Sequence, residues 1–240
     1  MAFCLCYQKV KNMQKTKAAF VDIDKTLLNG VTSRAIAYAF YRRKLIPLTF
    51  FVRLLFWYLR YKYNNLQDFS QVLAHALDAT RDMPLDIANP LLQECFVKKI
   101  KPFFYVNFIK YLKELQKEGY KIFLVSSTIE PIAVIIQKYL KFDGVLATKP
   151  EICNNHYTGN ILGEVCYGLE KKKRIQELNQ QENFDFANSY TFSDHLSDLP
   201  MLELVKNPVV INPHGELKRI AKKRNWKILK FKELLKEADI

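Results

Sequence analysis

The stretch AAFVDIDKTLLNG, residues 18–30, decides the fold of this 240-residue chain. Its apolar beginning, residues 18–21, predicts a short buried strand, and Asp22 and Asp24 follow it directly. A chain that leaves a strand can bring both carboxylates to one site, and open α/β sheets place their chemistry at the carboxyl ends of strands. A carboxylate there can be a metal ligand, a nucleophile or a proton carrier. The alternative is an ordinary turn rich in Asp, Asn and Gly.

The composition is that of a globular protein with an excess of positive charge. Hydrophobic residues make up 49% of the chain and charged residues 25%, which excludes a disordered chain. The net charge of +13 favours anionic partners such as phosphorylated metabolites, phospholipid head groups or nucleic acid, without choosing among them. Because lysine and arginine are spread along the chain, we interpret most of them as solvated helix faces.

The cysteines and the N-terminus bear on the compartment. No pair among the five cysteines has the spacing of a zinc site, and a disulfide framework is not expected in a chain of this size, so we predict a reducing cytoplasm. Residues 1–12 contain a short apolar patch and then lysines, without the long apolar segment and cleavage site of a signal peptide. We interpret residues 1–16 as an N-terminal tail, with Met13 as an alternative start.

The remainder of the chain divides into a helical part and an alternating part. Helical patterns fill residues 31–102, whereas helices alternate with short apolar strands from residue 103 onward. The sequence therefore predicts an α/β fold, with a doubly wound parallel-sheet core of residues 17–30 and 103–240 and a helical cap of residues 31–102 inserted in it. The predicted helices span residues 33–44, 48–63, 66–79, 84–99, 104–118, 132–140, 171–180 and 199–205, and the further strands span 121–125, 144–147, 189–192 and 208–211.

The segment LIPLTFFVRLLFWYLRYKY, residues 45–63, is the most apolar part of the predicted cap. It is shorter than the ~20 apolar residues that a membrane span needs, and Arg53 interrupts it, so we do not predict a transmembrane helix. Two interpretations stay open: a cap helix packed on its neighbours, or an interfacial helix beside anionic lipid. One face of this helix carries Leu48, Phe51, Val52, Leu55 and Leu59, and another carries Arg53, Trp57 and Arg60.

Three further polar clusters follow predicted strands. Ser126 ends the strand of residues 121–125, where its hydroxyl can bond a phosphoryl oxygen. Lys171 begins a helix, where its ammonium can neutralise a phosphate. Asp194 and Asp198 are four residues apart in a loop that begins another helix, so both carboxylates can face one side. Each residue alone could be a helix cap or part of a basic run. Their order, each at a strand end, favours a functional site.

Together these residues supply what phosphoryl transfer requires. Two or three carboxylates can hold Mg²⁺ among oxygen ligands, and the metal and Lys171 shield the phosphate so that an anionic carboxylate can approach it. Asp22 is positioned to attack phosphorus and form an aspartyl-phosphate. Asp24 can protonate the leaving alkoxide and then deprotonate the water that releases phosphate.

The pattern resembles the haloacid dehalogenase superfamily. The Asp22-x-Asp24-x-Thr26 signature, Ser126, Lys171 and the Asp194-x-x-x-Asp198 pair are similar to its four motifs. The helical insert resembles its type-1 cap, and the span from about residue 17 to residue 229 is most similar to subfamily IB, the phosphoserine-phosphatase-like hydrolases.

This resemblance implies a Mg²⁺-dependent phosphatase and a role for each motif residue. Asp22 would be the nucleophile, and Asp24 would be the acid and base, with its main-chain carbonyl also binding Mg²⁺. Asp198 would orient either Lys171 or the metal ligands from behind. The implied metal ligands are Asp22, Asp24 and Asp194, supported by Asp198, and the implied phosphate-binding residues are Ser126 and Lys171, with Thr26 bracing the first loop.

Two departures from phosphoserine phosphatases concern the substrate. Those enzymes usually carry a cap glutamate nine residues after the nucleophile, where this chain has Val31, and Ser-Gly-Gly at the second motif, where this chain has Ser126-Ser127-Thr128. The cap helix with its arginines and aromatic residues instead resembles the branch of subfamily IB that is associated with phospholipid-type phosphomonoesters.

We therefore favour a phosphomonoesterase that acts on a small phosphorylated metabolite in the cytoplasm. The alternative is a membrane-surface phosphatase of lysophospholipid or phosphatidylglycerol phosphate-type monoesters, in peripheral contact with the inner face of the membrane, with Arg53, Trp57 and Arg60 as specificity residues. A third hypothesis is a basic nucleic-acid-binding protein. The sequence has no recognition helix, zinc finger or RNA-binding aromatic motif, so no nucleic-acid partner is expected.

Overall fold

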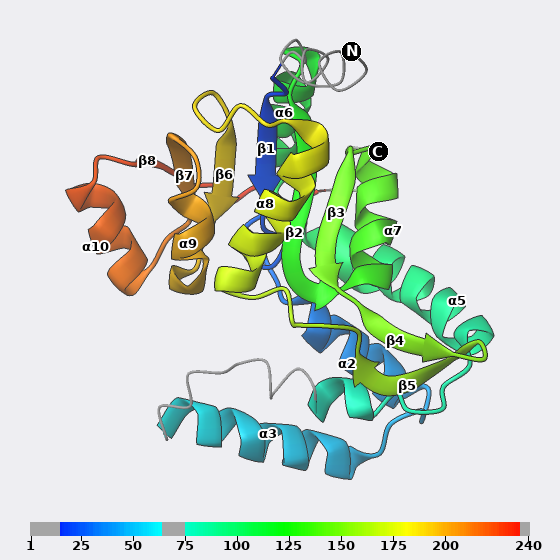
Figure 1. Cartoon of the computed structure of the whole chain (residues 1–240). Coiled ribbons are helices and arrows are strands. Elements are labelled where there is room, and N and C mark those ends of the chain that lie inside the picture. The colour runs from blue at the N-terminus through cyan, green and yellow to red at the C-terminus, as the bar shows by residue number, and fades with distance from the viewer. Residues whose placement is uncertain (1–14, 64–74, 236–240) are drawn as a thin grey trace, which may run out of the picture.

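A six-stranded parallel sheet forms the centre of the computed structural model, which describes residues 15–63 and 75–235 (Figure 1). Its strand order is β3-β2-β1-β6-β7-β8, and every neighbouring pair is parallel. The predicted α/β class with a parallel sheet is thereby confirmed. The strands are β1 (Ala18–Val21), β2 (Lys121–Ile129), β3 (Gly144–Thr148), β6 (Tyr190–Ser193), β7 (Asn207–Ile211) and β8 (Lys227–Leu229).

The central strand β1 is buried on both faces, which its unbroken apolar sequence predicts. Successive side chains of a strand point to opposite faces. Ala19 and Val21 accordingly share one hydrophobic cluster with helices on one side, and Ala18 and Phe20 share a second cluster with helices on the other side. The first pair of helices is α6 (Val106–Lys117) and α7 (Glu130–Leu140), and the second is α8 (Leu169–Glu182) and α9 (Leu199–Leu202). A further helix, α10 (Gly215–Lys223), packs at the β7–β8 edge.

The register of the sheet brings the predicted motifs to one edge. Val21, the last residue of β1, pairs with Leu124 of β2 on one side and with Phe192 of β6 on the other. The residues that follow each of these positions therefore lie at the same level, just beyond the last residue of β1. Because all three strands are parallel, their polar ends meet.

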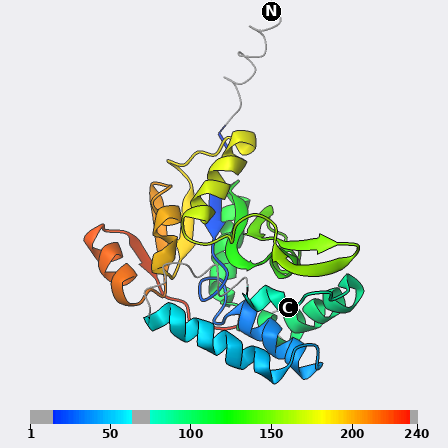
Figure 2. The same cartoon turned by 60° about the horizontal axis from the view of Figure 1, so that its bottom comes forward.

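A helical insert separates β1 from α6. It contains α2 (Thr32–Arg42), α3 (Leu48–Tyr63) and α5 (Leu85–Cys95), and it returns to the core through the π-helical turn η1 (Phe96–Ile100) and the 3-10 turn η2 (Lys101–Phe103). Residues 75–78 are helical, and most of the helix predicted over residues 66–79 lies outside the described residues. Figure 2 shows α3 running along the side of the molecule toward which the strands point. Among the described helices, none combines the length and the apolar character needed to cross a membrane.

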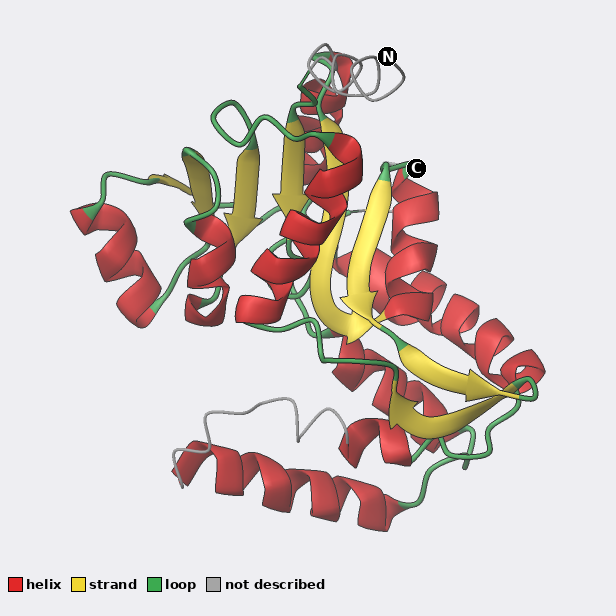
Figure 3. Cartoon of the chain, in the orientation of Figure 1, coloured by secondary structure: helices red, strands yellow, loops and turns green. Residues whose placement is uncertain are grey.

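An antiparallel hairpin of β4 (Pro150–Cys153) and β5 (His156–Ile161) extends from the core to the insert, an element that the sequence did not predict (Figure 3). The main-chain N–H of Asp82 donates to the carbonyl of Tyr157 at 2.8 Å, and the N–H of Tyr157 donates to the carbonyl of Met83 at 3.0 Å. The hairpin thus ties residues from late in the chain to the helical insert. The sequence also did not predict β8 or α10.

Candidate active site

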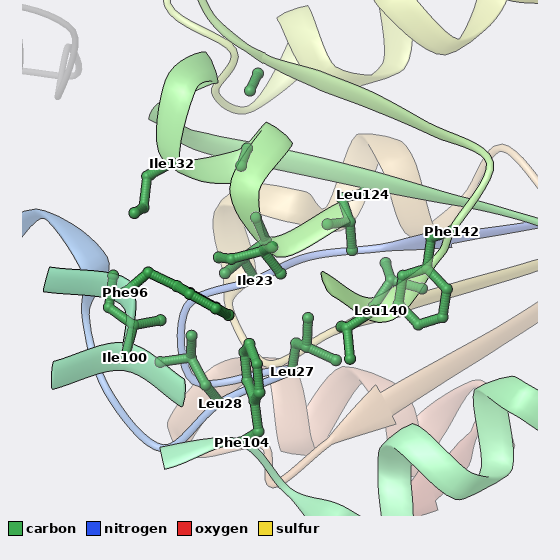
Figure 4. Packing of buried hydrophobic residues seen from close by; sticks show 14 of the residues in the cluster. Ile23, Leu27, Leu28, Phe96, Ile100, Phe104, Leu124, Ile132, Leu140 and Phe142 are labelled. Atoms are coloured by element: carbon green, nitrogen blue, oxygen red, sulfur yellow. The ribbon is translucent and has the colours of Figure 1, made fainter. Parts of the chain in front are cut away.

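Apolar side chains anchor the loop that carries Asp22 and Asp24 in the hydrophobic core. Ile23 lies between the two aspartates, and together with Leu27 and Leu28 it is buried in the largest hydrophobic cluster. Figure 4 shows these three side chains packed among residues from the returning segment of the insert and from the core. The N–H of Asp22 also donates to the carbonyl of Phe192 in β6 at 3.0 Å. The apolar residues therefore point inward and leave the carboxylates at the end of the sheet.

Lys171 joins two buried carboxylates. Its Nζ atom lies 2.6 Å from Oδ1 of Asp22 and 2.8 Å from Oδ2 of Asp198, and all three side chains are buried. Burial alone would lower the pKa of the Lys171 ammonium, but the charges of Asp198 and Asp22 outweigh it, so the net shift is upward and the group stays protonated. Gly168 precedes α8 at φ 57°, a backbone conformation that glycine adopts without steric cost. The structure therefore brings Asp22, Lys171 and Asp198 together, as the sequence predicted.

The two aspartates of the first motif have different surroundings. Burial raises the pKa of the Asp22 carboxyl, and the adjacent Lys171 ammonium opposes that shift. Burial also raises the pKa of Asp24, to about 6, against hydrogen bonds from Thr32 that favour its charged form. The Asp24 carboxylate accepts the Thr32 N–H at 2.9 Å and the Thr32 hydroxyl at 3.2 Å. A carboxyl whose pKa lies near neutrality is suited to both giving and taking a proton.

Asp194 and Asp198 are held by neighbouring hydroxyls. Thr26 donates its hydroxyl to Oδ1 of Asp194 at 3.3 Å, so the predicted bracing residue of the first loop contacts the last motif. Ser193 donates to Oδ2 of Asp198 at 2.6 Å, the same oxygen that accepts from Lys171. Burial raises the pKa of Asp194. Asp198 thus contacts Lys171 directly, and its role in orienting that ammonium stays a prediction.

Ser126 lies in β2, two residues past the position that pairs with the last residue of β1, but β2 itself does not end there. The sequence predicted that this strand ends at residue 125, whereas β2 continues to Ile129 because β3 keeps pairing with it, with an irregular register between Ser126 and Ile129. Ser126 is buried, and its Oγ accepts the N–H of Thr128 at 3.2 Å. The Ser126 hydroxyl is the acceptor in this bond, so its own proton can be donated to another group.

Of the three predicted specificity residues, the structure describes the side chain of Arg53, whose ion-pair partner lies in the insert. Arg53 pairs with Asp78 at 3.3 Å, a contact between α3 and residues 75–78 of the insert, and both side chains are exposed to solvent. The side chains of Trp57 and Arg60 lie outside the described residues.

Side-chain oxygens of this cluster could supply some of the ligands of a hard divalent cation. In the described ranges, no three His, Cys, Asp or Glu side chains form a complete cage. The Asp24 carboxylate is turned to Thr32, which leaves Asp22 and Asp194 as the side-chain candidates. Oδ1 of Asp198 is buried without a hydrogen-bond partner among the described residues. One or two carboxylates with water and substrate oxygens is the usual set for Mg²⁺, so the residues fit this ion.

Sequence reasoning missed three hydroxyl residues that support the motifs. Ser193 holds Asp198, Thr32 holds Asp24, and Thr128 lies 2.7 Å from Thr32, measured between the two Oγ1 atoms. Ser193 stands beside Asp194 in the sequence, so its position offered a signal. Thr32 and Thr128 are 96 residues apart, and nothing in the local pattern pairs them.

The site is thus a buried aspartate–lysine cluster at the carboxyl edge of a parallel sheet, and the match to a hydrolase family gives the class of the protein. The chain belongs to the haloacid dehalogenase-like hydrolases, whose family pattern matches residues 19–203. This confirms the superfamily resemblance.

The individual proteins that the chain is similar to match between half of it and most of it. It is 32% identical over 122 residues to the phosphoserine phosphatase SerB1 of Mycobacterium tuberculosis, covering 51% of this chain and 40% of that protein. It is 32% identical over 124 residues to a histidinol-phosphatase of Neisseria meningitidis, covering 49% of this chain and 54% of that protein. A crystal structure of a protein of unknown function from Bordetella pertussis superposes with a TM-score of 0.81 at 23% identity, covering 90% of this chain and 99% of that one.

Proposed function

We propose that this enzyme is a Mg²⁺-dependent phosphomonoesterase that hydrolyses small phosphorylated metabolites through an aspartyl-phosphate on Asp22. The observation that carries the proposal is the buried contact of Lys171 with Asp22 at 2.6 Å and with Asp198 at 2.8 Å. The ammonium holds the nucleophile in place and offers positive charge to an incoming phosphate. The relatives named phosphoserine phosphatase and histidinol-phosphatase support a phosphate monoester as the substrate.

The reaction consists of two displacements at phosphorus. In the first, a carboxylate oxygen of Asp22 forms a bond to phosphorus, and the bond to the leaving oxygen breaks as Asp24 gives that oxygen a proton. In the second, Asp24 takes a proton from water, whose oxygen attacks phosphorus, and the bond to Asp22 breaks to release inorganic phosphate. Ser126 and Lys171 hold the phosphoryl oxygens. Mg²⁺, held by Asp22 and Asp194 and by the Asp24 carbonyl, would supply further positive charge.

A phosphate-release screen with Mg²⁺ tests this function. Its substrates are phosphoserine, histidinol phosphate, sugar and nucleotide monophosphates, and lysophosphatidate. We expect Asp22→Asn to abolish the activity and a chelator to suppress it reversibly. Asp86→Asn, which removes an exposed carboxylate at the start of α5, is the matched control and should keep full activity. Phosphate release by Asp22→Asn at the rate of the unaltered enzyme would contradict the proposal.

One observation favours a second candidate, a phosphatase that works on lipid monoesters at a membrane surface. Three apolar side chains of α3 lie on one helix face and are more than half exposed: Leu48 at 62%, Val52 at 66% and Leu55 at 56%. The helix is held on its other side by Phe50, which is buried. Both sequence interpretations of this segment therefore have support, because the helix packs through one face and leaves an apolar stripe, Leu48–Val52–Leu55, in contact with water.

The charge around this stripe suits an anionic surface. Residues 25–67 contain no Asp or Glu, although Arg43 and Arg53 pair with Glu94 and Asp78 from later in the insert. An apolar helix face within a basic segment is typical of helices that lie in the interface of anionic membranes. The same region holds eight cationic residues: Lys25, Arg34, Arg42, Arg43, Lys44, Arg53, Arg60 and Lys62.

Vesicle flotation distinguishes the two candidates. We expect the chain to float with phosphatidylglycerol vesicles and not with phosphatidylcholine vesicles if the second candidate holds. Leu48→Gln, Val52→Gln and Leu55→Gln combined should then abolish flotation and slow turnover of lysophosphatidate in vesicles. Ile152→Gln with Leu162→Gln removes two exposed apolar side chains elsewhere and is the control. If the stripe variant floats as well as the unaltered chain, the second candidate fails and the first stands.

A further inference from the structure

We propose that Thr32 and Thr128 form a buried hydrogen-bonded pair that positions Asp24 for its proton transfers, and that they are positioning residues of this enzyme. The inference rests on the proposed function, because it assigns the acid and base role to Asp24. Thr32 lies outside the motifs from which the site was predicted, and Thr128, the third residue of the second motif, was given no role there.

Thr32 fixes the Asp24 carboxylate through two atoms. Its N–H donates to Oδ1 at 2.9 Å and its hydroxyl donates to Oδ2 at 3.2 Å, so both carboxylate oxygens are held. Thr32 is the first residue of α2, and the preceding Val31 offers no side chain to cap the helix. Asp24 therefore caps α2 from a distance, at the end of the helix where a negative charge is favoured. The start of the helical insert and the orientation of Asp24 are consequently coupled.

Thr128 sets the direction of the hydrogen bonds. The two threonine hydroxyls are 2.7 Å apart and both are buried, so water does not compete for them. A hydroxyl has only one proton to donate. If Thr32 gives its proton to Asp24, Thr128 must give its own to Thr32, and the chain runs from Thr128 through Thr32 to Asp24. Such a chain strengthens each bond in it and restricts rotation of the carboxylate.

The same threonine also reaches the predicted phosphate-binding residue. The N–H of Thr128 donates to Oγ of Ser126 at 3.2 Å. One residue of β2 therefore fixes, by its backbone, the hydroxyl that would hold phosphate and, by its side chain, the group that would protonate the leaving oxygen. Thr128 thus links the proposed acid, Asp24, to the proposed phosphate-binding residue, Ser126. Such a link suits a reaction in which the acid and the phosphate must lie within hydrogen-bond reach of each other.

The test compares two leaving groups of similar size. Benzyl phosphate releases an alkoxide that needs a proton, whereas p-nitrophenyl phosphate releases a stabilised phenolate that needs little help. General acid catalysis contributes typically ~10²–10⁴-fold, and partial misplacement of the acid should lose a fraction of that. For Thr32→Val we expect kcat/KM to fall about tenfold on benzyl phosphate and less than about threefold on p-nitrophenyl phosphate. Thr128→Val should show the same selectivity with a smaller loss.

Two sets of variants separate positioning from general damage. Thr32→Ser and Thr128→Ser keep the hydroxyls and should restore the rate on benzyl phosphate. Thr191→Val is the matched control, because Thr191 is buried in β6 and its hydroxyl has no hydrogen-bond partner among the described residues. It should change neither rate. Equal losses on both substrates in the valine variants, or no loss on benzyl phosphate, would overturn the inference.

The outcomes for the two proposals are distinguishable. If the proposed function is wrong, the unaltered enzyme with Mg²⁺ turns over neither substrate, or Asp22→Asn does so as well. If only the positioning role is wrong, the unaltered enzyme is active and requires Asp22, but the valine variants lack the selective loss. A thermal unfolding curve for each variant shows whether it is folded before the rates are compared.

Discussion

The carboxyl edge of the sheet and the outer face of α3 differ in which kind of side chain is buried and which is exposed. At the sheet edge, Asp22, Lys171 and Asp198 are charged groups that the fold buries and pairs. On α3, Leu48, Val52 and Leu55 are apolar groups that the fold exposes. Buried charge opposes folding unless it is paired, whereas an exposed apolar face contributes no burial to folding and marks a place where a partner can bind. The charges of the first region are paired inside the chain, whereas the apolar face of the second is buried only if a partner covers it.

Removing the cation should produce the largest effect, because it breaks the compensation within the first region. Lys171→Met leaves Asp22 and Asp198 buried next to each other without a positive charge. Leaving one partner of a buried ion pair alone costs about 3–5 kcal/mol. We expect a loss of that order in the free energy of unfolding at pH 7 without metal, measured by urea denaturation. Activity should fall by more than about 10³-fold, because the proposed nucleophile, Asp22, loses its orientation and the phosphate loses its charge partner.

Lys173 supplies the control for this experiment. It lies on the same helix, its side chain is 62% exposed, and its contacts with Glu170 and Glu177 are long surface pairs. Lys173→Met should change the free energy of unfolding by less than about 1 kcal/mol and leave the rate unaltered. If Lys171→Met proved as stable as Lys173→Met, the buried carboxylates would not depend on Lys171 for their charge compensation.

The contrast between the regions also explains what the sequence could predict. Asp22 and Asp194 follow β1 and β6, and Ser126 lies in β2 just beyond the level at which β1 ends, and parallel strands bring such positions to one edge whatever the details of packing. Lys171 lies in the first turn of α8, where its place before a helical pattern was the signal. The unbroken apolar sequence of β1 predicted that both faces of this strand are buried. These expectations depend on periodicity and order along the chain, which one sequence contains.

Features that depend on contacts between distant segments could not be predicted. The pairing of Thr32 with Thr128 spans 96 residues. The hairpin β4–β5 is local, but its strands are only four and six residues long and mostly polar, so the alternation of Tyr157 and Ile161 with polar residues gave a weak signal. The end of β2 was placed too early because its extension depends on continued pairing with β3. For α3, the helical period predicted an apolar face correctly, but whether that face is covered depends on its neighbours and not on its sequence.

A smaller effect should come from the pH dependence of Asp24. Burial raises its pKa from 3.8 to about 6, so between pH 4 and 6 the folded chain keeps a proton that the unfolded chain has lost. The stability that this protonated carboxyl contributes is present below pH 4 and is lost as the pH rises through 6. In metal-free protein we expect the difference in unfolding free energy between the unaltered chain and Asp24→Asn to fall by about 1–3 kcal/mol from pH 4 to 7.

Urea denaturation at several pH values measures this difference. Subtracting Asp24→Asn removes the contributions of the other carboxyls, Asp22 among them, that titrate in the same range. A difference that stayed constant from pH 4 to 7 would mean that Asp24 is no harder to ionise in the folded chain than in the unfolded one, and the acid role would lose its support.

The smallest effect is expected where the second region is altered without a partner present. Leu48→Gln, Val52→Gln and Leu55→Gln change exposed positions, and such substitutions usually alter the free energy of unfolding by no more than about 0.5 kcal/mol each. Phe50→Ala, on the buried side of the same helix, should cost about 3 kcal/mol or more, because it opens a cavity. Turnover of p-nitrophenyl phosphate, which needs no surface contact, should stay within about twofold in the triple variant. If the triple variant instead lost as much stability as Phe50→Ala, the stripe would be covered within the folded chain, and no partner would be needed to explain its apolar sequence.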